Sequence, residues 1–169
     1  NNMSSEDVLK IVNLKHAWEF ILNKNVIMSE TNFALLCEIN KLVQEGFYIS
    51  AGKIRNVPVS IGGTSWKPDF PIEATIKEEL NMILNSEKED IDKAIELLLY
   101  TMKKQIYLDG NKRTAVIFSN HYLISKGKGI ISIPAELTDK FKELLIPYYE
   151  GKDELKIKEF LKNECYINI

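Results

Sequence analysis

The chain has 169 residues, of which 45% are hydrophobic and 27% charged, a composition that suits one globular domain with a sizeable core. A formal net charge of −2 excludes a global basic field that would attract nucleic acid or an acidic membrane. No apolar run approaches the roughly 20 residues of a membrane span, and the polar start NNMSSEDV lacks an apolar signal core. Cys37 and Cys165 lie far apart and outside any CxxC motif, so we expect reduced thiols and a cytoplasmic protein.

Apolar residues at helical spacing predict most of the elements in chain order. The first helix is expected over 5–24 with Ser4 or Ser5 as its cap, and a second begins at Ser29 or Thr31 and ends at Gly46. Five more helices are predicted, with a short extended piece, GIISIP, after the third of them. Their ranges are 72–86, 89–107, 111–126, 135–148 and 153–164.

The helical rhythm breaks between the second and third helices. Val57, Val59 and Ile61 occupy every second position before a Gly-Gly pair, which predicts a β-hairpin over about 54–67. Pro58 would make its first strand an edge strand, because proline has no backbone N–H to donate. Without any βαβ alternation, the chain is expected to be mainly α, a helical bundle with one hairpin.

The densest polar stretch, QIYLDGNKRTA, lies between two apolar helices. Gly110 allows the first helix to end, and Asn111 is predicted to cap the next, whose free N–H groups and dipole favour an anion such as phosphate. Lys112 and Arg113 occupy the first turn of that helix, where cations are unfavourable unless an anion binds there. Asp109 beside such a site could hold a Mg²⁺ that bridges to phosphate. An ordinary interhelical turn would use the same residue types, and that alternative stays open.

The stretch QIYLDGNKRTA resembles the signature of the Fic/Doc (Fido) family, usually written H-x-F-x-[D/E]-G-N-G-R-x-x-R, with the N-K-R-T-A second half of its Doc branch. The segment GKIRNVPVSIGGTSWKP is similar to the β-hairpin flap that precedes this signature in the family. The resemblance spans roughly residues 30–165 and implies one Fido-like domain over 1–169, with its signature at 105–116. Family members mostly transfer AMP from ATP to a protein hydroxyl, whereas Doc is a kinase. The resemblance therefore implies ATP as donor, Mg²⁺ as cofactor and a protein substrate with a Ser, Thr or Tyr hydroxyl.

The resemblance also implies a role for each matching position. Asp109 would bind Mg²⁺, and Arg113 would clamp a donor phosphate with its planar guanidinium. The flap would hold the target segment by strand addition. The implied phosphate- or nucleotide-binding residues are Gly110, Asn111, Lys112 and Arg113, and the implied target-binding residues are Val57, Val59 and Ile61.

Three positions depart from the family pattern. Gln105 replaces the signature histidine, and its amide cannot act as a general base, whose loss typically costs 10²–10⁴-fold in rate. Lys112 replaces the second glycine, which favours a Doc-like phosphoryl transfer, and Val116 replaces the final arginine. His16 and His121 are expected to be surface or core residues rather than substitutes for the base. The sequence thus predicts either an impaired transferase or an inactive Fido domain that binds a nucleotide or a partner.

Two further interpretations concern regulation and partners. Glu45, in KLVQEG, fits the end of the family's inhibitory helix motif and could pair with Arg113, although an amphipathic helix ending in glycine explains the same residues. A purely helical interaction module is the third functional class, with an antitoxin or a second copy as its partner. In that case Trp66 and the adjacent edge strand would form the interaction surface.

Overall fold

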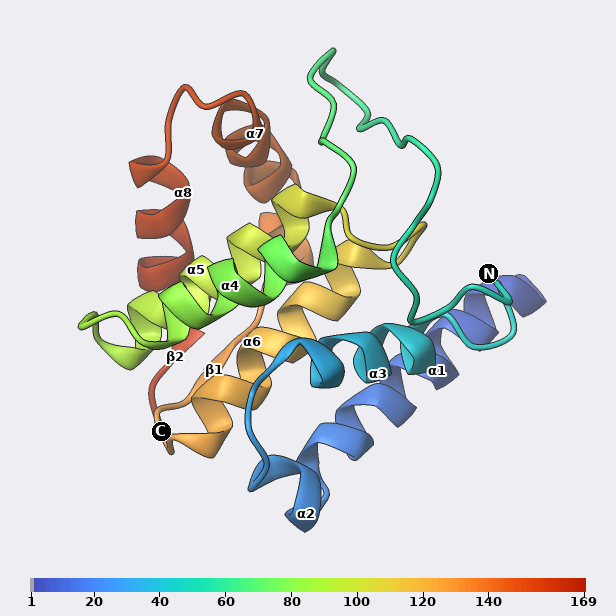
Figure 1. Cartoon of the computed structure of the whole chain (residues 1–169), viewed down its shortest axis with the longest axis horizontal. Helices are drawn as coiled ribbons and strands as arrows, with labels where there is room; N and C mark the ends of the chain where they lie inside the picture. The colour runs from blue at the N-terminus through green and yellow to red at the C-terminus, as the bar shows by residue number, and fades with distance from the viewer. Residues whose placement is uncertain (1) are drawn as a thin grey trace.

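The computed structural model describes residues 2–169 and confirms a mainly α architecture (Figure 1). None of the helices in this range is long and apolar enough to cross a bilayer. The helices are α1 (Ser5–Leu22), α2 (Lys24–Ile27), α3 (Phe33–Val43), α4 (Glu73–Leu84), α5 (Asp90–Lys104), α6 (Asn111–Ser125), α7 (Thr138–Tyr149) and α8 (Leu155–Phe160). A 3₁₀ turn (Ala135–Leu137) precedes α7, a π-helical turn (Leu161–Cys165) extends α8, and two short strands are β1 (Ile130–Ile131) and β2 (Tyr166–Ile167).

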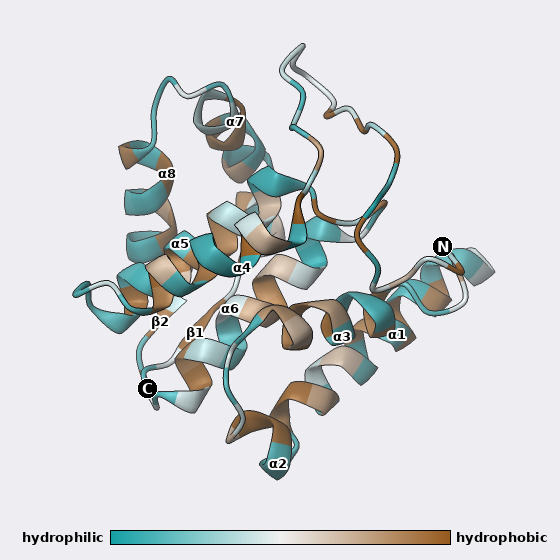
Figure 2. Ribbon diagram, viewed as in Figure 1, coloured by the Kyte–Doolittle hydropathy of each residue, from teal (hydrophilic) through white to brown (hydrophobic). Residues whose placement is uncertain are grey.

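Helix α6 runs through the middle of the molecule. In Figure 1, α1 and α3 lie on one side of α6, and α4 and α5 lie on the other. Most of its residues between Asn111 and Leu123 are buried, so it packs against neighbours all round. The outer helices carry both hydrophobic and hydrophilic residues along their length, as Figure 2 shows. Large fully buried side chains at the centre include Ile39, Leu98, Tyr107, Phe118 and Phe141.

The predicted helices are found close to their expected limits. Ser4 caps α1 by accepting a hydrogen bond from the Asp7 N–H at 3.1 Å. The second predicted helix begins later than expected, because Asn32 rather than Ser29 or Thr31 is its cap and accepts from the Leu35 N–H at 2.9 Å. The additional short helix α2 fills the interval that the sequence pattern left unassigned.

The antiparallel strand pair lies elsewhere than predicted. Residues 54–67 contain no strand, although they are extended on both sides of a turn at the Gly-Gly pair, whereas β1 pairs with β2 near the C-terminus. Pro58 cannot donate to a ladder. The Arg55 guanidinium donates instead to the carbonyls of Val57 and Asp69, at 2.9 and 2.8 Å, and so links the two limbs of the loop. We call residues 54–67 the flap loop, because the hairpin expected there is not formed.

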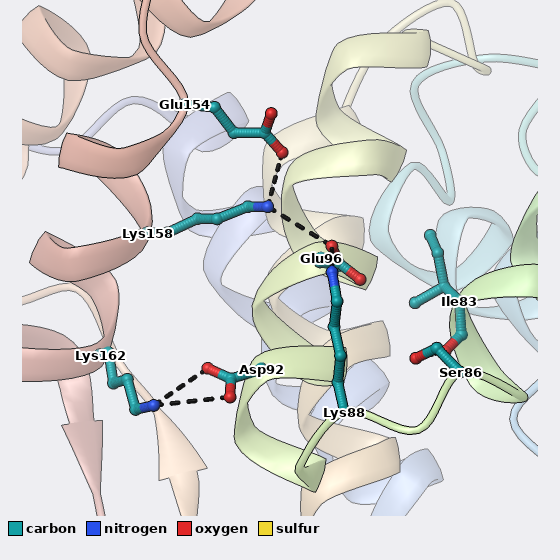
Figure 3. Close-up of polar contacts among 8 residues, drawn as sticks. All are labelled: Ile83, Ser86, Lys88, Asp92, Glu96, Glu154, Lys158 and Lys162. Carbon is teal, nitrogen blue, oxygen red and sulfur yellow. Dashed lines mark hydrogen bonds and ion pairs between the residues drawn. The ribbon is translucent and has the colours of Figure 1, made fainter.

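Ion pairs connect α5 to α8 and to the π-helical turn that follows α8 (Figure 3). Lys158 lies 3.4 Å from Glu96, and Lys162 lies 3.1 Å from Asp92. Lys88 approaches the same Glu96 carboxylate at 2.5 Å. Because these groups are partly exposed, each pair adds little stability, and their effect is mainly to fix the register of α8 on α5.

His121 is a structural core residue, as the sequence predicts. Its side chain is fully buried in α6, with Nδ1 accepting from the Thr31 hydroxyl at 2.8 Å and Nε2 donating to the Val26 carbonyl at 2.7 Å. Burial lowers the pKa of the His121 imidazole. His16 is exposed on α1.

This burial predicts a loss of stability in acid. The unfolded chain binds a proton on residue 121 at higher pH than the folded chain does, so the free energy of unfolding should fall as pH drops through the ordinary histidine range near 6.5. Urea unfolding between pH 8 and pH 5 measures this slope. His121→Gln should flatten it, while the exposed control His16→Gln should leave it unchanged. Equal slopes in wild type and His121→Gln would contradict the prediction.

Candidate functional site

The site forms where α5 ends and α6 begins. Gln105 ends α5 in a left-handed conformation, with φ 45°, and is the only non-glycine residue of positive φ in residues 2–169. Gly110, with φ 75°, then directs the chain into α6. A side chain at position 110 would also collide with Gln44, since a Cβ there would lie 2.6 Å from Gln44 Oε1. Both features explain why glycine stands at this position.

Asn111 stabilises the turn but does not cap α6, contrary to the sequence prediction. Its Nδ2 donates to the Tyr107 carbonyl at 2.8 Å and to Gln105 Oε1 at 3.3 Å, and its Oδ1 accepts from the Tyr107 N–H at 3.0 Å. The side chain therefore points back into the loop, and Gly110 occupies the cap position without a side chain. The first turn of α6 keeps uncapped N–H groups, as an anion site requires.

Arg113 faces the interior of the site and not bulk solvent. Its Nη2 donates to Gln44 Oε1 at 3.0 Å, while its Nη1 is buried and has no hydrogen-bond partner in the described residues. Buried guanidinium N–H groups are nearly always paired, so this free donor is unusual and suits an incoming anion. Gln44 itself is buried on the turn that follows α3.

Lys112 is turned away from Arg113, toward α7. Its Nζ lies 5.1 Å from the centroid of the Phe141 ring, and burial together with the charge of Lys142 lowers its pKa. Both Lys112 and Arg113 nevertheless border one cavity of about 470 Å³ between α1, α6 and β1. Its other walls are largely apolar and include Trp18 and Ile131. The two cations therefore stand at the edge of a cavity that has room for a ligand.

Asp109 lies at the exposed start of the turn that precedes α6. Its Oδ1 accepts from the Gly110 N–H at 2.7 Å, while the side chain is exposed at the mouth of the turn. No group of three or more His, Cys, Asp and Glu side chains that could hold a metal occurs in residues 2–169. A single carboxylate fits Mg²⁺ well, because Mg²⁺ commonly binds one or two carboxylates together with phosphate oxygens and water.

Gln105 is engaged within the turn. Its amide Nε2 donates to the Met102 carbonyl at 2.7 Å, and its Oε1 accepts from Asn111. Its main-chain carbonyl accepts from Arg55 Nε at 2.5 Å. The amide is thus already hydrogen-bonded on both sides, and it has no titratable group to remove a proton from a hydroxyl.

The expected contact between Glu45 and Arg113 is not made. Glu45 is exposed, and it is the neighbouring Gln44 that reaches the guanidinium. Asn13 of α1 accounts for the position of Glu45, since its amide donates to the Glu45 carbonyl at 2.7 Å. The residue that touches Arg113 is therefore neutral, and only a hydrogen bond joins the two side chains.

Asn40 of α3 is a second buried amide at the site, beside Gln44, and was not predicted from the sequence. Asn40 donates to the Asp109 carbonyl at 3.1 Å and to the Thr114 hydroxyl at 3.2 Å, and accepts from the Gly52 N–H at 2.9 Å. It thereby ties α3 to the turn and to the loop that leads into the flap. Asn40 lies on the buried face of α3, and Gln44 follows the last residue of α3. Polar residues are unusual at such buried positions, and their spacing of four residues is the signal that could have revealed both.

The flap loop lies over this end of the molecule (Figure 1). Val57 is exposed, whereas Val59 and Ile61 are half-buried, so the predicted target-binding residues do not share one free face. The far end of the loop is fixed to α7. The Trp66 ring stacks on Tyr149 at 5.5 Å, and the Thr64 hydroxyl donates to the Glu150 carboxylate at 2.6 Å.

A family sequence model and two solved structures are similar to this chain. The sequence model of the Fic/DOC family matches residues 30–123, which include α3, the flap loop and the whole turn. The sequence matches none of the curated proteins.

Two solved structures show the same fold. A Fic domain containing signaling protein from Bacteroides thetaiotaomicron aligns over 96% of this chain and 69% of its own, with a TM-score of 0.75 and 17% identity. Fic-1, residues 134–508, from C. elegans aligns over 95% of this chain and 48% of its own, with a TM-score of 0.74 and 20% identity. Because the family model covers more than half of the sequence, the chain belongs to the Fic/DOC family.

Proposed function

We propose that the chain binds a magnesium nucleotide at the N-terminus of α6 and transfers AMP or phosphate to a protein hydroxyl at a low rate. The observation that carries this proposal is the buried Arg113 Nη1, which has no partner beside an uncapped helix start. The nucleotide phosphates would accept from Arg113 and from the N–H groups of the first turn. Asp109 would hold Mg²⁺, which neutralises the phosphate charge and orients the donor.

The other residues of the chain assist in distinct ways. Asn111 keeps the loop closed, so that the first N–H groups of α6 point outward. The flap loop would position the hydroxyl of a Ser, Thr or Tyr residue by main-chain pairing along its extended limb. Position 105, which adjoins the phosphate site in the turn, would receive the hydroxyl proton if it carried a base.

A second candidate function is nucleotide or partner binding without turnover. The geometry of Gln105 favours it, because both polar ends of the amide are satisfied inside the turn. The amide is thereby held within the turn, and it has no titratable group to remove a proton from a hydroxyl. An antitoxin or a second copy of the chain would be the natural partner of such an inactive domain.

The test common to both candidates is nucleotide binding. Isothermal titration with Mg-ATP should give saturable heat, and Arg113→Ala should weaken the affinity about 10–100-fold, because a charge-assisted contact to phosphate is lost. Lys126→Ala, at the other end of α6, is the control and should bind as wild type does. Absence of heat at millimolar nucleotide, or an unchanged affinity in Arg113→Ala, would refute the phosphate site.

A further inference from the structure

A second pocket lies beside the end of α5, separate from the cavity that Lys112 and Arg113 border. Its volume is about 430 Å³, and it opens between residues 66–72, the start of α4, the last turn of α5 and α7. Its walls are rich in aromatic rings, namely Trp66, Phe70, Tyr100 and Tyr148. Two lysines, Lys103 and Lys104, come from the turn of α5 that directly precedes Gln105.

The two lysines differ in whether a carboxylate forms an ion pair with them. Lys104 pairs with Glu79 at 3.3 Å. The Lys103 ammonium instead lies 5.6 Å from the Trp66 ring centroid and 5.2 Å from that of Tyr148, and no carboxylate of residues 2–169 forms an ion pair with it. Asp69 and Glu79 also line the pocket, but Glu79 pairs with Lys104 and neither carboxylate forms an ion pair with Lys103, so the Lys103 ammonium remains available to an anionic ligand.

The mouth of this pocket is apolar and exposed. Phe70 is 57% exposed and Ile72 is 62% exposed, and both belong to the extended limb that leads from the flap loop into α4. Single exposed apolar residues are ordinary, but two at the rim of an aromatic pocket indicate a binding surface. Pro68 and Pro71 keep this limb extended, so a polypeptide could lie along it with a side chain in the pocket.

We propose that this pocket selects the acceptor polypeptide by binding an aromatic side chain, while a neighbouring carboxylate of the same segment pairs with Lys103. The inference rests on the proposed function, because only a protein substrate needs a side-chain pocket beside position 105. A polypeptide fits better than the donor nucleotide, since Lys104 is paired with Glu79 and Lys103 alone leaves one ammonium for an anion. The guanidinium and free main-chain N–H groups that suit a polyphosphate lie at the start of α6.

Two capped dipeptides test the chemistry directly. Acetyl-Asp-Tyr-amide and acetyl-Lys-Tyr-amide share the ring and differ in charge, and each is titrated into the protein while the indole N–H signals of Trp66 and Trp18 are followed by NMR. The acidic dipeptide should shift the Trp66 signal and bind about fivefold more tightly than the basic one, since a partly exposed ion pair contributes modestly. The Trp18 signal should stay unchanged, because Trp18 lines the other cavity.

Variants assign this preference to Lys103. Lys103→Gln should bind both dipeptides equally. Lys126→Gln, which removes another lysine that lies on an aromatic ring, should keep the preference. Phe70→Ser, a change at an exposed residue, should weaken both dipeptides together. Equal binding of the two dipeptides by wild type, or a preference that survives in Lys103→Gln, would overturn the proposal.

The same titrations separate the pocket from the phosphate site. If Mg-ATP shifts the Trp66 signal and displaces the acidic dipeptide, the pocket belongs to the nucleotide and the proposal fails. Intact Mg-ATP binding without dipeptide discrimination would refute the pocket alone. If the protein discriminates between the two dipeptides but does not bind Mg-ATP, the proposed function is refuted. The preference of the pocket for an acidic aromatic segment would still hold.

Discussion

Gln105→His is expected to raise the rate of transfer from Mg-ATP by about 10²–10⁴-fold, the usual contribution of a positioned general base. The imidazole would replace an amide that cannot titrate, on a backbone already fixed in the left-handed conformation by the end of α5. Transfer is measured with ATP labelled at the α- or γ-phosphate and a cell lysate as the source of acceptor protein. The position of the label that is transferred distinguishes AMP from phosphate transfer.

The pH dependence gives this prediction a second readout. A histidine base acts in its neutral form, so the rate of the variant should rise with pH through the ordinary histidine range near 6.5 and then level off. Gln105→Asn is the matched control, because it changes the side chain without supplying a base, and it should stay at the wild-type rate. The combination of Gln105→His with Arg113→Ala should lose the gain, since the donor phosphates would no longer be held.

Two results would contradict the proposed role of a general base at position 105. If Gln105→His remains as slow as Gln105→Asn while Mg-ATP still binds, the turn is not a transfer site and the chain acts as a binding domain. If wild type already transfers label and Gln105→Ala transfers it equally well, the proton must leave by a route that does not involve position 105.

The sequence predicted the parts of the site that depend on local chain geometry. Gly110 was expected to end the first helix, but Gln105 ends α5 in the left-handed conformation, and Gly110, which also has a positive φ, directly precedes α6. Asn111 was predicted as a cap, yet its amide bonds to Tyr107. Where the side chain points depends on the path by which the loop returns, and this path is set by packing against α3.

The contacts that complete the site come from distant parts of the chain. Gln44 and Glu45 are adjacent in the turn that follows α3, yet their side chains lie differently. Gln44 is buried and reaches Arg113, whereas Glu45 is exposed. The alternating pattern of residues 54–67 favoured a strand, but strand pairing needs main-chain groups that are free to pair. Pro58 has no N–H to donate, and the Val57 carbonyl accepts from Arg55.

Arg55→Met is expected to lower the free energy of unfolding by about 3 kcal/mol, because three main-chain carbonyls lose their donor at roughly 1 kcal/mol each. Arg55 is 6% exposed and donates to the carbonyls of Gln105, Val57 and Asp69. It forms no ion pair among residues 2–169, so its charge is compensated by the three carbonyl oxygens and by the Phe70 ring, whose centroid lies 5.6 Å from the guanidinium carbon. Urea unfolding gives the change, and Lys53→Met, at an exposed residue two positions earlier, is the control and should unfold as wild type does.

Arg55→Lys separates the charge of the guanidinium from its shape. A lysine keeps the positive charge but has one ammonium in place of a planar fork, so it cannot reach three carbonyls that lie in different directions. We therefore expect a loss between that of Arg55→Met and wild type. Because the Arg55 Nε bond fixes the carbonyl of Gln105, both variants should also weaken Mg-ATP binding under conditions in which they remain folded. Unchanged unfolding and unchanged affinity in Arg55→Met would show that the flap loop and the turn hold their positions independently, and that the link between them has no bearing on the site.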